Sequence, residues 1–211
     1  MAEERKGMEK DLSQLAGRYD LIYADPPWPM WGDPNKNAAA GKHYDLMTLD
    51  QIKQMPIKSL FRDKGALFLW ATCPRLDIAM DTIKAWGMHY RGIAFIWVKT
   101  RKDGEIIHGQ GVPPTATKPT SEVCLLATTN KQGRPFPLTS HNTPQVILHP
   151  RGRHSQKPST IRRHIEQLYG DRPKIELFAR QSSNGWDGWG NEFPGEEAKE
   201  EEQGKRMEAR G

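Results

Sequence analysis

Short apolar runs alternate along the chain with segments that have the 3.6-residue spacing of helices. Residues 19–24 are rich in β-forming side chains and stop at two prolines, which predicts a strand that ends in a loop. Residues 66–71 are apolar at every position, the pattern of a strand that is covered on both faces. Further strands are predicted at residues 93–98, 122–127, 146–148 and 174–179.

Helical segments are predicted between these strands. Residues 48–61 predict a helix that is interrupted at Pro56, because proline removes a backbone donor and clashes with the preceding turn. Residues 74–86 and 159–168 predict two more helices, and Pro158 stands at the start of the second, where proline is tolerated. The alternation of strands and helices favours the α/β class with a mixed or parallel sheet.

The length of 211 residues fits one domain with a core of ordinary size. We expect residues 1–17 to form an N-terminal arm with a short helix near residues 12–16, and residues 18–194 to form the folded domain. Residues 195–211 are rich in Glu and Lys without an aromatic residue, and we expect them to be disordered.

The charge of the chain is unevenly distributed. The net charge is +5, yet residues 131–165, the acid-free segment, contain seven Lys or Arg and four His without one Asp or Glu. Such a segment fits a polyanionic partner, and the alternative is a solvated basic face without a ligand.

We expect a cytoplasmic protein, because no apolar run is long enough to cross a membrane and the N-terminus is charged without a leader behind it.

The loop Asp25-Pro26-Pro27-Trp28 follows the first predicted strand, at the edge where open α/β sheets bind ligands. It suits chemistry at the exocyclic amine of adenine, a poor nucleophile whose lone pair is delocalised into the ring. The Asp25 carboxylate and a backbone carbonyl of the rigid Pro-Pro stretch could accept the two amine hydrogens and favour a tetrahedral nitrogen. Trp28 offers a surface on which an extruded base can stack. The alternatives are a plain turn and a core tryptophan.

With this loop as its first motif, the chain resembles the MT-A70 family of adenine-N6 methyltransferases, relatives of the catalytic subunit of the messenger-RNA adenosine methyltransferase. The resemblance covers roughly residues 19–194. It implies a Rossmann-like methyltransferase sheet flanked by helices in a single domain. It also implies a permuted motif order, with the catalytic loop early in the chain and much of the cofactor site late. The matching segments are residues 19–28, 43–44, 67–70, 86–87, 97–99, 122, 155–158, 176–180 and 189–192.

The resemblance further implies S-adenosyl-L-methionine as cofactor and assigns site residues. Lys157 corresponds to the lysine that reaches the cofactor carboxylate, although a lysine beside a helix could equally lie on the surface. Tyr44 and Lys99 correspond to substrate-binding positions beside Trp28, with packing and a solvated strand end as their alternatives. For Glu122 a structural salt bridge is the favoured role. The other cofactor positions, each of which could instead be structural, are Asp25, Glu176, Phe178, Arg180, Asn191 and Glu192.

Two departures from the eukaryotic members concern the cofactor's adenosine end. Only a short charged arm precedes Arg18, and Ser182 stands where a histidine is expected. We expect an active adenine-N6 methyltransferase that prefers DNA, because the chain is compact, with RNA as the alternative substrate. The alternatives are a non-catalytic nucleic-acid-binding subunit, or methylation of a cytosine amine or a protein amide, for which Ser or Asn usually replaces Asp25.

A homo- or heterodimer is compatible with the resemblance. No His forms a ligand spacing with Cys, Asp or Glu, so we expect no metal.

Overall fold

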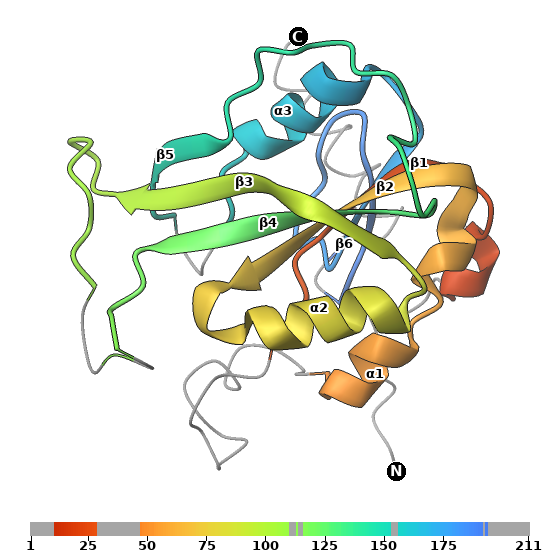
Figure 1. Ribbon diagram of the computed structural model, residues 1–211, viewed down its shortest axis with the longest axis horizontal. Helices are drawn as coiled ribbons and strands as arrows, with labels where there is room; N and C mark the ends of the chain where they lie inside the picture. The colour runs from red at the N-terminus through yellow and green to blue at the C-terminus, as the bar shows by residue number, and fades with distance from the viewer. Residues whose placement is uncertain are drawn as a thin grey trace, which may run out of the picture.

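The computed structural model describes residues 11–28, 47–109, 113, 116–152, 156–191 and 193. Within these residues, seven strands form one sheet with helices on both faces (Figure 1). No helix among these residues is long and apolar enough to cross a membrane. The elements are η1 (Leu12–Leu15), β1 (Tyr19–Ala24), α1 (Leu49–Gln54), η2 (Ile57–Leu60), β2 (Phe61–Thr72), η3 (Cys73–Arg75), α2 (Leu76–Ala85), β3 (His89–Thr100), β4 (Ser121–Thr128), β5 (Val146–Pro150), α3 (Thr160–Tyr169), β6 (Lys174–Leu177) and β7 (Asp187–Trp189).

The strand order is β5-β3-β4-β2-β1-β6-β7. Within this sheet β4 runs antiparallel to its neighbours β2 and β3, and all other neighbouring strands are parallel. The carboxyl ends of six strands therefore share one edge with the amino end of β4. We call it the catalytic edge, because the Asp25 loop leaves β1 there. Strand β1 lies between β2, which follows it in the chain, and β6, which comes near the end of the chain. The direction in which strands are added to the sheet therefore reverses at β1, and ligands bind at such switch points of α/β sheets.

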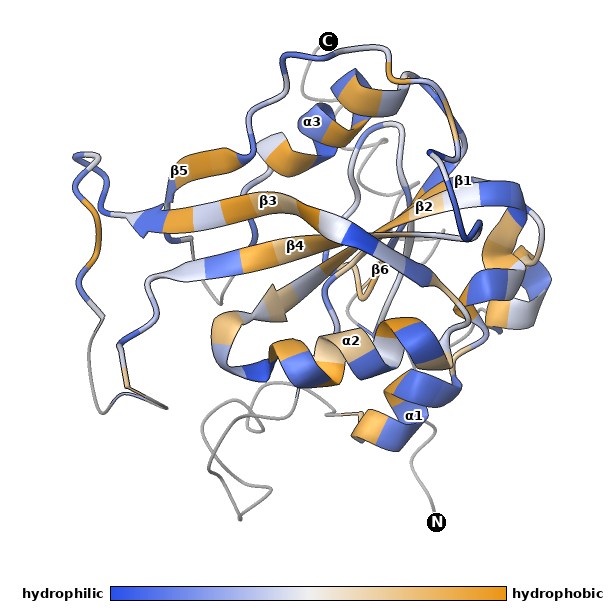
Figure 2. Ribbon diagram, in the orientation of Figure 1, coloured by the Kyte–Doolittle hydropathy of each residue, from blue (hydrophilic) through white to orange (hydrophobic). Residues whose placement is uncertain are grey.

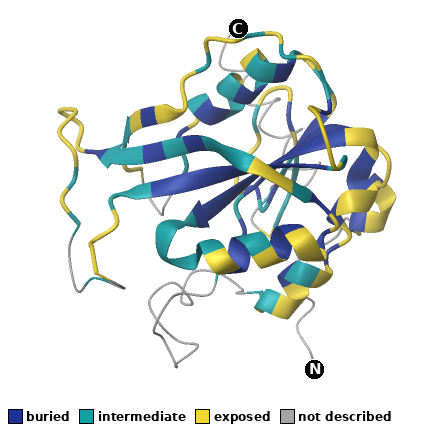
Figure 3. Ribbon diagram, in the orientation of Figure 1, coloured by how far each residue is buried: buried dark blue, intermediate teal, exposed yellow. Residues whose placement is uncertain are grey.

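Alternate side chains of the central strands enter two different cores. Ile22 and Ala24 of β1 pack in the core beneath α1 and α2, whereas Leu21 and Tyr23 pack in the core beneath α3. All six residues of β1 are buried as a result. Figures 2 and 3 show the same pattern, with apolar, buried strands between helices that expose their polar sides. The run of residues 66–71 is likewise buried throughout, which confirms the expected strand with two covered faces.

Most expected elements are present. The expected strand at residues 19–24 is β1, and the expected break at Pro56 separates α1 from η2. Thr48 and Gln51 form a reciprocal capping box that starts α1. Leu12 and Leu15 of η1, the short helix expected within the N-terminal arm, are buried against the core beneath α1 and α2. Residues 195–211 lie outside the described residues.

The end of the chain differs from the expectation. The strand predicted at residues 174–179 ends at Leu177, because Phe178 adopts a left-handed backbone conformation with φ of 61°. The sequence also gave no sign of β7, which adds a parallel edge strand beside β6. β7 is only three residues long and contains a glycine, so it lacks the alternation that identifies strands. Backbone pairing with β6 decides its conformation.

Candidate active site

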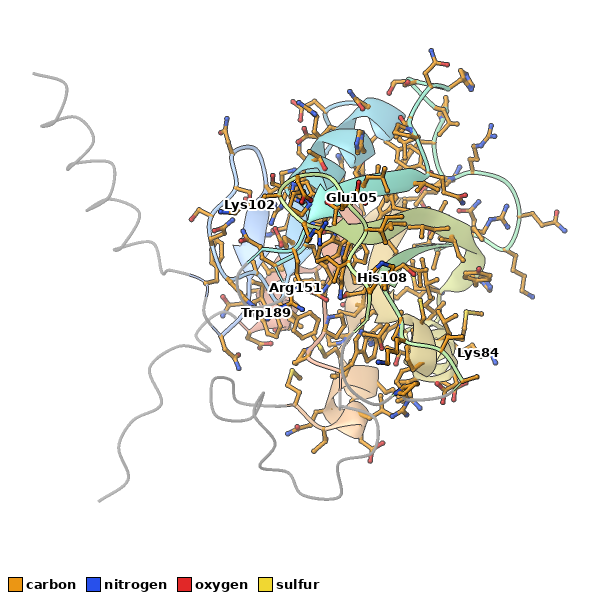
Figure 4. The ribbon with its side chains drawn as sticks, turned by 90° about the vertical axis from the view of Figure 1, so that its left-hand side faces the viewer. Lys84, Lys102, Glu105, His108, Arg151 and Trp189 are labelled. Carbon is orange, nitrogen blue, oxygen red and sulfur yellow. The ribbon has the colours of Figure 1, made fainter. Side chains whose placement is uncertain are left out.

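Four charged side chains from separate parts of the chain meet at the catalytic edge. Asp25 follows β1, Lys99 lies near the end of β3, Glu122 lies at the start of β4, and Lys157 precedes α3. Figure 4 looks onto this edge, where Arg151 and Trp189 are labelled. Because β4 is antiparallel to its neighbours, its first residues lie level with the last residues of β2 and β3. The sheet topology thus brings Glu122 to the same edge as Asp25.

The four groups form a continuous chain of alternating charge. The Lys157 ammonium donates to both carboxylate oxygens of Asp25 at 2.8 and 2.7 Å, and it lies 3.2 Å from Glu122. The second ammonium, that of Lys99, lies 2.6 Å from Glu122. The exposed fractions of the side chains are 25% for Asp25, 11% for Lys157, 9% for Glu122 and 22% for Lys99. Lys157 is therefore not the surface lysine that its sequence context also allowed.

Burial and neighbouring charges change the proton affinities of this chain in different directions. Burial raises the pKa of Asp25 above its usual value, and the charge of Lys157 opposes that increase only in part. Burial alone would raise the pKa of Glu122 as well, but Lys157 and Lys99 outweigh it and lower the value. Burial acts to lower the pKa of Lys157, but the two carboxylates raise it above its usual value. The ammonium of Lys157 therefore stays protonated and stabilises both carboxylates in their charged forms.

The Asp25 loop is fixed by two hydrogen bonds. The Trp28 amide donates to the Pro26 carbonyl at 2.8 Å, which closes a tight turn. The Trp28 indole donates to the backbone carbonyl of Trp70 at the end of β2, also at 2.8 Å. The ring is half-buried and packs against the core beneath α1 and α2, so it combines a packing role with a partly exposed surface. The turn holds the Pro26 carbonyl in place, and its second lone pair can still accept a hydrogen bond.

The residues after β6 and β7 lie side by side next to this loop. The Ala179 amide donates to the Trp189 carbonyl at 3.0 Å, and the rings of Phe178 and Trp189 meet edge to face at 5.8 Å. A Cβ atom at Gly190 would lie 2.6 Å from the Ala179 carbonyl oxygen, so only glycine fits there. Arg180 lies close enough to Asp25 to lower its pKa. These segments therefore form one wall of the site beside β1.

Glu176 has a partner within the protein. The Arg162 guanidinium donates to its two carboxylate oxygens at 2.6 and 2.9 Å, and Arg162 also lies over the ring of Tyr23. The sequence did not identify Arg162 as the partner, because it is fourteen residues away on α3. A bidentate, largely buried pair gives Glu176 a structural role. Its part in cofactor binding remains a prediction.

The structure brings together most of the residues that the sequence indicated. Asp25, Pro26, Pro27 and Trp28 lie in one loop at the catalytic edge, with Lys99 and Lys157 linked to it through the ionic chain. The expected salt bridge of Glu122 is present, with two lysine partners instead of one. Phe178, Arg180 and Asn191 lie on the wall after β6 and β7. Tyr44 and Glu192 lie outside the described residues.

Comparison with known proteins identifies the family. The MT-A70 family model matches residues 19–192. The type II methyltransferase M.MunI of Mycoplasma sp. is 30% identical over 84% of this chain and 78% of its own length. Human N(6)-adenosine-methyltransferase catalytic subunit METTL3 is 30% identical over 88% of the chain but only 30% of its own length. Human N(6)-adenine-specific methyltransferase METTL4 is 26% identical over 82% of the chain and 37% of its own length. The chain therefore belongs to the MT-A70 family of adenine-N6 methyltransferases, as its sequence motifs indicated.

Proposed function

We propose that the protein transfers a methyl group from S-adenosyl-L-methionine to the N6 amine of adenine in nucleic acid, with DNA as the preferred substrate. The observation that carries this proposal is the position of the Asp25 carboxylate. It stands at the carboxyl end of the central strand β1, in the family's Asp-Pro-Pro-Trp loop, where a buried lysine donates to both of its oxygens and opposes the rise in pKa that burial causes. A carboxylate in this position fits an amine that gains positive charge as it reacts.

The residues of the loop have separate roles at the adenine amine. Asp25 and the Pro26 carbonyl accept the two amine hydrogens, which localises the nitrogen lone pair for attack. Asp25 then stabilises the positive charge on nitrogen until the proton is lost. A carboxylate offers about four acceptor positions, so Asp25 can accept from the amine while it remains bound to Lys157. Trp28 stacks on the base, and its indole bond to Trp70 fixes the stacking surface.

The neighbouring residues fit the cofactor's chemical groups. Bound S-adenosyl-L-methionine supplies an electrophilic methyl group on a sulfonium. Its carboxylate suits the ammonium of Lys157, whose pKa remains raised inside the site. The aromatic ring of Phe178 offers an apolar wall, and Asn191, an exposed amide, offers hydrogen bonds to the ribose. Glu176 and Glu192 remain further candidates for the cofactor, as Tyr44 and Lys99 remain for the substrate.

Two observations support DNA and an active enzyme. The chain spans most of M.MunI, a bacterial type II methyltransferase, and less than a third of METTL3, which is named for adenosine. The intact loop and its bond to Lys157 argue against a non-catalytic binding subunit. METTL3 is named as a catalytic subunit, so a dimer of this chain remains a prediction that light scattering can test.

The test is transfer of labelled methyl to matched DNA and RNA oligonucleotides, single- and double-stranded, with nucleoside digestion to identify the product. Wild type should yield N6-methyladenine, with the highest rate on DNA. Asp25→Ala should yield none while it still binds the cofactor, because the lost acceptor acts mainly in the transition state. Normal turnover by Asp25→Ala would refute the catalytic role of this residue. Faster transfer to RNA would refute the DNA preference.

A further inference from the structure

The acid-free segment does not gather at the catalytic edge. It begins in the loop after β4 at the opposite edge, crosses to the catalytic edge along β5, and returns along α3 (Figure 1). Lys131 and Arg134 therefore lie at the opposite edge, and the Arg91 guanidinium at the start of β3 donates to the Lys131 carbonyl at 3.0 Å. Arg151 lies at the catalytic edge, where its amide donates to the Thr100 carbonyl at 3.2 Å.

Among the described residues, four exposed cations lie along this path and Arg91 lies beside it, and we call these five the cationic face: Arg91, Lys131, Arg134, Arg151 and Arg163. Within the described part of the chain, none of the five forms an ion pair with a carboxylate. Two other cations of the same segment are neutralised, Lys157 by Asp25 and Glu122, and Arg162 by Glu176. The described part of the acid-free segment therefore contains two kinds of cation: buried ones that pair with carboxylates, and exposed ones that form no ion pair with a carboxylate.

The nearby acidic side chains are themselves bound. Glu166 on α3 and Asp171 after it both bind the ammonium of Lys174, at 3.5 and 2.6 Å. Glu166 also accepts from the indole of Trp186, which joins it to the segment before β7. Two carboxylates that share one buried ammonium weaken the cationic face less than free carboxylates would.

The loop after β4 is held against the carboxyl end of α3 at Thr139. The Thr139 amide donates to the Leu168 carbonyl at 2.9 Å, and its hydroxyl donates to the Gln167 carbonyl at 2.7 Å. Burial raises the pKa of Tyr169, and the charges of Arg134 and Arg91 oppose that increase. Both guanidinium groups therefore lie near the carboxyl end of α3.

We infer that the cationic face is a second contact surface for the phosphate backbone of the nucleic-acid substrate, running from the catalytic edge to the opposite edge of the sheet. This inference rests on the proposed function. Arg91 and Thr100 are both on β3, and the nine residue-to-residue steps from one to the other correspond to about 30 Å at ~3.3 Å per residue. A duplex of about nine base pairs covers the same length. Short substrates therefore reach only the catalytic edge, and longer ones reach the whole face.

Three substitutions on the face test the inference: Lys131→Gln, Arg134→Gln and Arg163→Gln in one protein. The control carries the same change of charge on the other face, with Lys53→Gln, Lys58→Gln and Lys84→Gln. Lys84 projects from α2 well away from Arg151 (Figure 4). Binding of labelled oligonucleotides of about 6 and about 24 nucleotides, with the target adenine near the same end, is measured by anisotropy from about 50 to about 200 mM salt. Thermal unfolding checks that all three proteins remain folded.

Loss of three phosphate contacts should reduce the slope of log affinity against log salt by about 2 to 3 on the long oligonucleotide. Across the fourfold salt range, wild type should therefore lose about 20- to 40-fold more affinity than the triple variant. On the short oligonucleotide the two should bind equally, and the control should match wild type throughout. An unchanged slope, an equal loss on both lengths, or an equal loss in the control would overturn the inference. The binding assay does not depend on methyl transfer. A failure of this inference can therefore be distinguished from a failure of the proposed function, which the methyl-transfer assay tests.

Discussion

Replacement of Lys157 by methionine removes the cation that Asp25 and Glu122 share. Methionine has a similar length and no charge, so the packing over Trp70 is largely kept while both carboxylates lose their common partner. Glu122 retains Lys99 at 2.6 Å, whereas Asp25 retains only the charge of Arg180, which lowers its pKa less than Lys157 does. The cost therefore concentrates on Asp25.

The size of that cost follows from the burial of the pair. Breaking a fully buried ion pair costs about 3–5 kcal/mol, and an exposed pair contributes about 0–1 kcal/mol. Lys157 is 11% exposed and Asp25 is 25% exposed, so the pair is closer to the buried limit. We expect a loss of about 2–3 kcal/mol in the free energy of unfolding at neutral pH. With a slope of about 2 kcal/mol/M, the urea midpoint should fall by about 1 to 1.5 M.

The loss should depend on pH in a defined direction. The pKa of Asp25 is already raised by burial, and removal of Lys157 raises it further. An acid whose pKa is higher in the folded state destabilises the fold above that pKa, and the penalty disappears as pH falls through it toward the unfolded value. Lys157→Met should therefore approach wild-type stability as the pH is lowered. When Asp25→Asn is added to Lys157→Met, the double variant should regain part of the lost free energy of unfolding at neutral pH.

The assay is urea unfolding of wild type, both single variants and the double variant, at neutral pH and at about pH 4, near the ordinary pKa of aspartate. A double-mutant cycle then gives the coupling energy between Lys157 and Asp25. Equal midpoints for wild type and Lys157→Met, or a loss that does not shrink on acidification, would refute the assignment of this pair as the main stabilisation of the Asp25 carboxylate.

Three further predictions follow from contacts in and beside the site. Lys157→Ala should weaken cofactor binding measured by calorimetry, and unchanged affinity would contradict the placement of the cofactor carboxylate at this lysine. Arg162→Met leaves Glu176 largely buried and unpaired, so it should lower the free energy of unfolding by about 2–4 kcal/mol, whereas a substitution at exposed Arg163 should leave it within about 0.5 kcal/mol. Gly190→Ala places a methyl group 2.6 Å from a backbone oxygen, so it should lower the thermal midpoint and weaken cofactor binding together; a variant with wild-type values of both would show that the wall can move freely.

Local patterns in the sequence determined the elements and the catalytic loop. The apolar run before Asp25 and the two prolines after it indicate a strand end there, because proline has no N–H to donate to the hydrogen-bond ladder of a sheet. The interruption at Pro56 and the doubly buried strand at residues 66–71 follow in the same way from local stereochemistry and solubility. Motif order along the chain was enough to indicate the family.

Tertiary structure decided which distant groups meet. Asp25 and Lys157 are 132 residues apart, and no local pattern encodes their contact. The antiparallel direction of β4 places Glu122 between two lysines, and backbone pairing with β6 creates β7 from three residues without strand character. The acid-free segment was visible in the sequence, but only its path across the sheet and back separates cations that serve the catalytic edge from cations that remain exposed. Local propensities act over a few residues, whereas the pairing of charges depends on strand order and direction, which the packing of the whole sheet selects.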